Sequence, residues 1–247
     1  MNPLIVIPAR LASSRLPDKP LADIGGRAMI LRVLDAARAA DVGRAVVAAA
    51  DAPIAAAVEA DGGEAVLTDP DLPSGSDRVH AAARRLDPDG RHDVVVNLQG
   101  DMPTLSPAAL RAVVAVLAAA PAADIATLAT PTEDAAEIAD PNVVKAVLAL
   151  EPGGERGRAL YFTRAAAPAG PGPVWHHIGV YAFRRAALER FTGLSPSPLE
   201  RRERLEQLRA LEAGMRIDAA LVAESPLGVD TPADLEVVRG VFAGRAG

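Results

Sequence analysis

The amino-acid sequence predicts an α/β protein whose β-sheet is doubly wound and mostly parallel, with helices on both faces of the sheet. Short runs of β-branched residues alternate with alanine-rich stretches long enough for helices, which is the order typical of α/β folds. The run Val94–Val96 is apolar at every position, as expected of a strand buried on both faces. No internal repeat interrupts this alternation.

The expected elements follow in order along the chain. Strands are predicted at Leu4–Pro8, Arg44–Ala49, Glu64–Leu67, Asp93–Leu98, Ile125–Thr130, Val143–Leu150, Ile178–Phe183 and Arg216–Leu221. Helices are predicted at Ala28–Ala40, Pro53–Ala60, Ser76–Leu86, Pro107–Ala119, Arg184–Phe191, Pro198–Ala213 and Pro232–Phe242. Ligands of such a sheet bind beyond the carboxyl ends of its strands.

We predict a single domain over residues 1–247, because a chain of 247 residues can bury one substantial core. Only Pro168–Pro173 has the composition of a linker, and it lies too far along the chain to separate two equal domains. An excursion from the main sheet is expected at about residues 151–213.

Composition narrows the class of protein. A net charge of -6 argues against a nucleic-acid partner. The absence of cysteine excludes disulfides and thiolate-bound zinc, and is compatible with a cytoplasmic location. The start of the chain has no basic region before its apolar stretch, and the most apolar window, Ala112–Ala120, is too short to span a bilayer. We therefore expect a soluble protein that is not a membrane partner.

The segment Ala9–Leu21, which follows the first expected strand, is unusually long for a strand-to-helix loop. It carries the cations Arg10, Arg15 and Lys19 together with two serines and two prolines. Several converging cations are what a triphosphate requires. The loop matches neither the Walker pattern nor the dinucleotide-binding glycine pattern. From these residues alone, a solvated basic loop remains the alternative.

Lysine is scarce in this chain. Of 26 basic residues only Lys19 and Lys145 are lysine, and the others are arginine. A retained lysine indicates a place where a compact point charge is wanted, although chance survival is an equal alternative.

Two aspartates stand where a metal could bind. Asp101 follows the strand at Asp93–Leu98 on a glycine turn, and Asp230 precedes a helix that Thr231 is expected to cap. Alone, each could be an ordinary turn or helix-start residue. Together they could supply the one or two carboxylates with which proteins usually hold Mg²⁺ beside substrate phosphates.

Several segments in order resemble one family. Ile7-Pro8-Ala9-Arg10 followed by Ser14-Arg15-Leu16-Pro17-x-Lys19-Pro20-Leu21 is similar to the signature of the CMP-KDO synthetases, the 3-deoxy-manno-octulosonate cytidylyltransferases. Ser74–Arg78, Gln99-Gly100-Asp101, Tyr161–Arg164, His177–Tyr181 and Gly228–Pro232 resemble further family segments. One departure is Met102, where many relatives have glutamate.

The resemblance implies a Rossmann-like nucleotidyltransferase fold whose excursion serves sugar binding or dimerisation. It implies that Arg10, Arg15 and Lys19 contact the CTP phosphates and that Asp101 and Asp230 hold Mg²⁺ as catalytic residues. The CTP-binding set that it implies is Ala9, Arg10, Ser13, Arg15, Lys19, Ser74, Gly75, Arg78 and Gln99. An ordinary helix cap remains the alternative for Ser74.

For the acceptor sugar KDO, the resemblance implies contacts from Arg164, His177, Tyr181, Glu203 and Gln207. His177 and Tyr181 are four apart in an expected strand and so share a face. Glu203 and Gln207 are four apart in an expected helix and so share a helical face. A structural role or a solvated face is the alternative for each pair.

The implied reaction is CTP + KDO giving CMP-KDO and pyrophosphate for lipopolysaccharide biosynthesis, in a cytoplasmic homodimer. No residue of the sequence is required as a general base, and Lys145 is expected to balance charge near the nucleotide. Two alternatives stay open: a CMP-sialic acid synthetase-like activity on another acidic sugar, and a non-catalytic nucleotide-binding regulator.

Overall fold

The computed structural model describes residues 1–13, 15–223 and 225–245. Ser14 of the arginine-rich segment therefore lies outside the described residues. The chain divides into two compact units, which we treat separately: the first comprises Met1–Arg111 and the segment from Pro226 onward, and the second comprises Ala112–Ser225. A single domain over the whole chain stays a prediction. The expected excursion falls entirely within the second unit.

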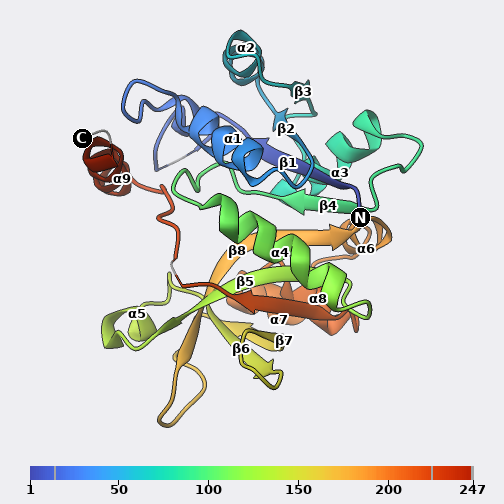
Figure 1. Ribbon diagram of the computed structural model, residues 1–247, viewed down its shortest axis with the longest axis vertical. Helices are drawn as coiled ribbons and strands as arrows, with labels where there is room; N and C mark the ends of the chain where they lie inside the picture. Colours follow the sequence, from blue (N-terminus) through green and yellow to red (C-terminus); the bar gives the residue numbers. More distant parts are fainter. Residues whose placement is uncertain (14, 224, 246–247) are drawn as a thin grey trace. The chain divides into compact units, whose positions relative to one another are not determined.

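The first unit contains a fully parallel sheet (Figure 1). Its strands are β1 (Pro3–Ala9), β2 (Arg44–Ala49), β3 (Ala65–Leu67) and β4 (Val94–Asn97), in the order β3-β2-β1-β4. All three described pairings are parallel, with Leu4 opposite Arg44 and Val95. Every residue of β4 is buried, which is the pattern that its continuous apolar run predicted.

Helices connect and cover these strands. They are η1 (Lys19–Leu21), α1 (Met29–Ala40), α2 (Ala52–Ala60), α3 (Gly75–Leu86) and α9 (Pro232–Arg245), with α4 (Pro107–Ala119) beginning in the first unit and ending in the second. Helix α1 buries Ile30, Val33, Leu34 and Ala37, whose spacing of three and four residues forms one helical stripe. A second buried group, which we call the α9 cluster, consists of Ile24, Met29, Val229, Leu235 and Val238.

The second unit has a largely antiparallel sheet. Its strands are β5 (Ile125–Thr132), β6 (Lys145–Leu150), β7 (Arg156–Thr163), β8 (Val174–Arg184) and β9 (Ile217–Leu221). Among the described strand pairings of this unit, β5 and β9 pair in parallel, whereas β5–β8, β6–β7, β6–β8 and β7–β9 are antiparallel. These pairings run in a closed circuit through the five strands.

The prediction of a mostly parallel sheet is therefore wrong for the second unit. Strand β7 was not predicted, because Arg156, Gly157 and Arg158 at its start lack β-branched character. It follows β6 after the short segment 151–155 and pairs with it, and a connection that short permits only an antiparallel partner. The whole chain is thus a mixed α/β fold.

The helices of the second unit are α5 (Ala135–Ala139), α6 (Arg185–Thr192), α7 (Pro198–Glu203) and α8 (Leu208–Glu212). The single helix predicted at Pro198–Ala213 is wrong: it breaks at Arg204, whose φ of 56° is left-handed. The Arg164 guanidinium stabilises the break, since it donates to the carbonyl oxygens of Glu203 at 2.8 Å and Arg204 at 3.5 Å. Both carbonyls belong to the end of α7, where helix acceptors lose their partners.

Among the helices of the described part of the chain, none has the length and apolar character needed to cross a membrane.

Candidate active site

The loop between β1 and α1 is anchored by packing. Leu16 packs against the α9 cluster, and its amide donates to Ser13 Oγ at 3.4 Å. The 3-10 helix η1 then begins at Lys19, directly after Asp18, which adopts a left-handed φ of 52°. Aspartate tolerates that conformation better than most residues. The loop therefore presents Lys19 from a defined backbone.

Lys19 is the centre of the site. Its Nζ donates to Asp101 Oδ2 at 2.8 Å, to the carbonyl oxygen of Val229 at 2.9 Å and to Asp230 Oδ1 at 3.1 Å. Burial acts to lower the pKa of Lys19, but the charges and hydrogen bonds of both carboxylates outweigh it, and the net effect is a raised pKa. A charged ammonium thus draws together two carboxylates that are distant in sequence.

The backbone around Asp101 is fixed from two sides. Asp101 follows the carboxyl end of β4, and its carbonyl oxygen accepts from the amide of Val229 at 2.9 Å. A Cβ at Gly100 would lie 2.9 Å from the carbonyl oxygen of Pro8, which is closer than side chains approach backbone. Glycine is therefore required for β4 to lead past the end of β1 into the site.

The backbone around Asp230 is fixed by the start of α9. Thr231 Oγ1 accepts from the amide of Asp234 at 3.2 Å, and the Asp234 carboxylate accepts from the amides of Thr231 at 2.8 Å and Asp230 at 3.0 Å. This confirms the predicted capping arrangement. Asp230 itself does not cap the helix, so its carboxylate is available to the site.

Two arginines complete the cationic side of the site. Arg15 Nη2 lies 3.2 Å from Asp230 Oδ2, in a pair whose side chains are 63% and 54% exposed. A pair this exposed adds little to stability, so Arg15 can change partner at low cost. Arg10 is exposed and makes no hydrogen bond or ion pair with other described residues. Its guanidinium is free to meet an anion.

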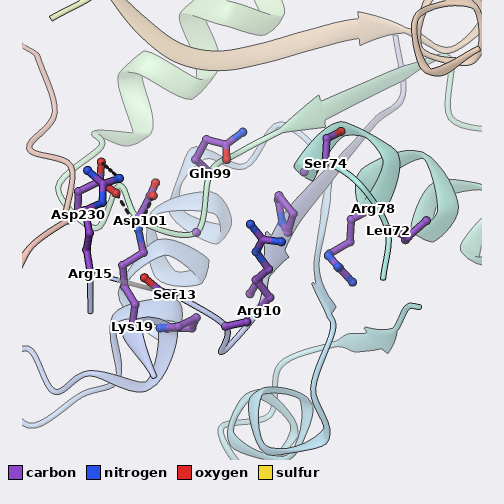
Figure 2. Close-up of a pocket in the computed structure, with 16 residues that line it drawn as sticks. Arg10, Ser13, Arg15, Lys19, Leu72, Ser74, Arg78, Gln99, Asp101 and Asp230 are labelled. Carbon is purple, nitrogen blue, oxygen red and sulfur yellow. Dashed lines mark hydrogen bonds and ion pairs between the residues drawn. The ribbon is translucent and has the colours of Figure 1, made fainter. Parts of the chain in front are cut away.

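These residues surround one cavity of about 360 Å³. Figure 2 shows the cluster of Arg15, Asp101 and Asp230 on one side of it, with Arg10 and Arg78 on the other. The lining comprises Pro8, Ala9, Arg10, Ala12, Ser13, Arg15, Lys19, Pro20, Leu72, Ser74, Gly75, Arg78, Gln99, Gly100, Asp101 and Asp230. Every residue predicted to bind CTP or magnesium is in that set. Leu72 was not predicted, because no local pattern marks the loop after β3 as functional.

The residues predicted to contact base or ribose line the cavity, but some of their groups already have partners. Ser74 Oγ accepts from the amide of Asp77 at 3.1 Å, so Ser74 caps α3 as the alternative interpretation held. Arg78, buried at 3% exposure, donates to Thr68 Oγ1 at 2.5 Å and to the carbonyl oxygen of Asp69 at 2.9 Å. Arg78 therefore secures the loop that carries Leu72. Gln99 donates to Asn97 at 3.1 Å.

The residues predicted to bind the sugar all belong to the second unit. His177 and Tyr181 share a face of β8, as predicted, since their ring centroids are 5.6 Å apart. His177 is buried against Phe162, and its Nε2 lies 3.0 Å from Thr127 Oγ1. Burial, with a smaller effect from neighbouring His176, lowers the pKa of His177 to about 3. The imidazole is thus neutral and forms part of the core.

Arg164 and Glu203 each already make hydrogen bonds to the segment that carries the other residue. The Glu203 carboxylate accepts from Thr163 Oγ1 at 2.8 Å and from the Arg164 amide at 2.9 Å. The Arg164 guanidinium in turn donates to carbonyl oxygens at the end of α7 and to that of Pro141 at 2.8 Å. This pair ties β7 to α7.

The predicted helical face shared by Glu203 and Gln207 is wrong, because the break at Arg204 separates the two residues. Glu206 is the acid whose charge reaches the phenol of Tyr181; burial first, and then this charge, raises the pKa of Tyr181. Glu206 was not predicted as a site residue, because in an unbroken helix it would not share the face of Glu203 and Gln207.

Lys145 is fully buried at the start of β6. Its Nζ donates to the carbonyl oxygens of Asp140 at 2.8 Å and Val143 at 2.5 Å. Burial lowers the pKa of Lys145, with opposing effects from Asp140 and Glu203. These contacts lie within the second unit and hold the segment before β6, so the nucleotide role expected for Lys145 stays a prediction.

Fold and site together have the character of a nucleotidyltransferase, in which cations and paired carboxylates face one cavity at the carboxyl ends of parallel strands. Residues 4–217 match the pattern of the cytidylyltransferase family. The 3-deoxy-manno-octulosonate cytidylyltransferase of Rhodospirillum centenum is 66% identical over 100% of this chain and 95% of its own. That of Parvibaculum lavamentivorans is 60% identical over 99% of this chain and 94% of its own. The chain belongs to the 3-deoxy-manno-octulosonate cytidylyltransferase family.

Solved structures agree with this assignment. A structure of CMP:2-keto-3-deoxy-manno-octonic acid synthetase complexed with CTP superposes with a TM-score of 0.91 and 38% identity, covering 99% of this chain and 100% of the other. A nucleotidyl transferase from Methanothermobacter has a TM-score of 0.63 at 18% identity, covering 100% and 99% of the two chains. The second likeness concerns the fold alone.

Proposed function

We propose that this protein transfers CMP from CTP to the anomeric hydroxyl of 3-deoxy-D-manno-octulosonate (KDO), forming CMP-KDO and pyrophosphate for lipopolysaccharide biosynthesis. The observation that carries the proposal is the convergence of Lys19, Asp101 and Asp230 at 2.8 and 3.1 Å in one cavity. The names of relatives up to 66% identical support the choice of CTP and KDO.

The cationic residues of the loop would receive the triphosphate. Arg10 has no competing partner among the described residues, and Arg15 has only an exposed ion pair to give up. Guanidinium groups suit bidentate contacts with phosphate oxygens, and the Lys19 ammonium suits a point contact. Ala9, Ser13, Ser74, Gly75, Arg78 and Gln99 complete the proposed CTP-binding set.

The two carboxylates fit a magnesium ion. Asp101 Oδ2 and Asp230 Oδ1 both lie within hydrogen-bond distance of the same Lys19 nitrogen, so both already face one cationic position. No group of three or more metal-ligating side chains converges within the described residues. Mg²⁺ is commonly held by one or two carboxylates together with substrate phosphates. When bound, Mg²⁺ would supply positive charge between the carboxylates and the two anionic substrates.

The reaction is an in-line substitution at the α-phosphorus. The anomeric oxygen of KDO forms the new bond to phosphorus, the bond from phosphorus to the bridging oxygen breaks, and pyrophosphate leaves with that electron pair. The hydroxyl proton leaves for solvent, and no residue is assigned here as its general base. Arg10, Arg15 and Lys19 would stabilise the charge on the leaving pyrophosphate, so that catalysis rests on positioning and charge neutralisation.

For the sugar, we propose that Arg164, His177, Tyr181, Glu203 and Gln207 belong to the binding region. Their partners indicate that His177, Arg164 and Glu203 position backbone and core, whereas the side chains of Tyr181 and Gln207 make no hydrogen bond to another described residue. A Rossmann-like arrangement, a homodimer formed through the excursion at 151–213, and a cytoplasmic location complete the proposal.

The test is release of pyrophosphate from CTP in the presence of Mg²⁺, with KDO and with sialic acid as separate acceptors. We expect rapid release with KDO and little with sialic acid. The reverse preference would favour a CMP-sialic acid synthetase-like activity. Tight CTP binding without turnover on either sugar would favour a nucleotide-binding regulator.

A further inference from the structure

Asp51 occupies the N-cap position of α2 and does not cap that helix. Aspartate is among the residues best suited to capping, yet its side chain makes no hydrogen bond to the α2 backbone. The sequence of α2 explains how this is tolerated. Pro53 has no N–H to be capped, and the amide of Ile54 donates to the backbone carbonyl oxygen of Asp51 at 3.1 Å. The carboxylate is thereby released for another contact.

That contact is with the loop that faces the triphosphate. Asp51 Oδ2 accepts from the amide of Leu11 at 2.8 Å, across 40 residues of sequence. Immediately before it, the amide of Ala50 donates to the carbonyl oxygen of Ala9 at 2.9 Å. These two bonds hold the backbone on either side of Arg10, whose guanidinium makes no hydrogen bond or ion pair with another described residue.

The charge of Asp51 also acts on the side of the cavity that carries Arg10 and Arg78. Arg10 and Arg78 both line the cavity, and burial, followed by the charge of Arg10, lowers the pKa of Arg78. The charges of Asp51 and Asp69 act in the opposite direction on Arg78. Two guanidinium groups can therefore share one wall of the cavity because acidic groups stand beside them.

We infer that Asp51 is a positioning residue for the nucleotide site: its carboxylate fixes the backbone at Leu11, and so directs Arg10 towards the triphosphate. It does not contact substrate. The inference rests on the proposed use of CTP, and it concerns a residue that no motif of the chain marks.

The experiment compares three variants by calorimetric binding of CTP with Mg²⁺ and by steady-state kinetics. Asp51→Ser keeps a helix-capping residue but is too short to reach Leu11, and Asp51→Asn keeps an oxygen acceptor while removing the charge. We expect Asp51→Ser and Asp51→Ala to raise the Kd and KM for CTP about tenfold, as for loss of one hydrogen bond to a charged group. We expect a smaller rise for Asp51→Asn and an unchanged KM for KDO.

The control is Asp134→Ala. Asp134 is also an N-cap aspartate, but its side chain does cap its own helix, accepting from the amide of Ala136 at 2.8 Å. Its loss should leave the KM for CTP unchanged. Because Asp51→Ser places a residue suited to capping at the start of α2, it remains informative if Asp51→Ala folds poorly.

Three results would overturn the inference: wild-type affinity in Asp51→Ser, equal weakening in Asp51→Asn and Asp51→Ser, or a parallel rise in both KM values. Failure of the wild-type protein to bind CTP would instead count against the proposed function, so the two failures are distinguishable.

Discussion

Lys19 and Asp101, which are 82 residues apart in sequence, form an ion pair with Nζ 2.8 Å from Oδ2 and with side chains only 15% and 32% exposed. The same ammonium also holds Asp230 at 3.1 Å. Lys19 therefore has two tasks. It keeps two like charges close together before any ligand arrives, and in the proposed function it also contacts the phosphates of the nucleotide.

The first prediction concerns Lys19→Met, which removes the charge and keeps most of the length. Without the ammonium the two carboxylates repel each other, and we expect a loss of about 1–2 kcal/mol in stability, or roughly 3–6 °C in Tm. Added Mg²⁺ should raise the Tm of Lys19→Met by more than it raises the Tm of the wild type. Thermal scans with and without Mg²⁺ provide the measurement, and equal Mg²⁺ responses in both proteins would contradict it.

The second prediction concerns Asp101→Asn and Asp230→Asn. Each substitution preserves shape and removes one of the two charges that face Lys19, so we expect magnesium-dependent turnover to fall by a factor of about 100 or more. The fold should persist, since the backbone of Asp101 is held by Val229 and that of Asp230 by Asp234. Circular dichroism and pyrophosphate release are the measurements, and near-normal turnover would refute the assignment of both carboxylates.

The third prediction concerns the helix break at Arg204. Its side chain is exposed and its φ is 56°, a conformation that costs a non-glycine residue about 1 kcal/mol. Arg204→Gly should therefore stabilise the protein by about 0.5 kcal/mol after the greater freedom of glycine in the unfolded chain is deducted. Arg201→Gly, at an exposed position within α7, should destabilise by about 1 kcal/mol. Urea titrations measure both, and the same sign for the two variants would be inconsistent with this account.

The fourth prediction is a dependence of stability on pH through His177. The pKa of His177 in the folded protein, about 3, lies below the ordinary value of 6.5. Between these two values the imidazole is protonated in the unfolded chain and neutral in the folded protein. The contribution of His177 to the free energy of unfolding is complete above about pH 6.5. It falls by about 1.4 kcal/mol for each pH unit below that value. The loss between pH 6.5 and 5 is therefore about 2 kcal/mol.

His177→Leu should flatten that part of the stability profile, and Thr127 keeps its hydrogen bond to the carbonyl oxygen of Val180 at 2.9 Å in the variant. His92→Gln, in the first unit, is the control for removal of an imidazole. Urea unfolding midpoints between pH 5 and 7.5 test this. A profile for His177→Leu as steep as that of the wild type would show that another group is responsible.

Much of the first unit could be predicted from the sequence because its signals are local. Strand β2 of this unit, and helix α4 that begins in it, have the bounds predicted for them, since each is a continuous run of residues with one preference. Strand β7 could not be predicted in this way. Its first three residues, Arg156–Arg158, have little strand preference, and they pair because β6 and β9 offer edges on both sides of them.

The same distinction between local signals and contacts between distant residues applies to the candidate site. The loop carrying Arg10 and Lys19 could be selected from its length and charge, and the structure places the whole predicted CTP and metal set around one cavity. The hydrogen bond from Lys19 to the Val229 carbonyl spans 210 residues, and no local pattern contains such information. The break between α7 and α8 was missed for the same reason, because the residue that stabilises it, Arg164, lies 39 residues away.

The segment from Pro226 onward belongs to the first unit although the whole of the second unit, Ala112–Ser225, separates it in sequence from Arg111. It supplies Asp230, the Val229 carbonyl that Lys19 needs, and three members of the α9 cluster on which Leu16 packs. A ribosome that has synthesised residues 1–225 therefore carries every arginine and lysine of the site but only half of its carboxylates. On the proposed use of both carboxylates, a chain that ended at residue 225 would keep the strands of the parallel sheet but would lack Asp230 and the Val229 carbonyl that Lys19 contacts.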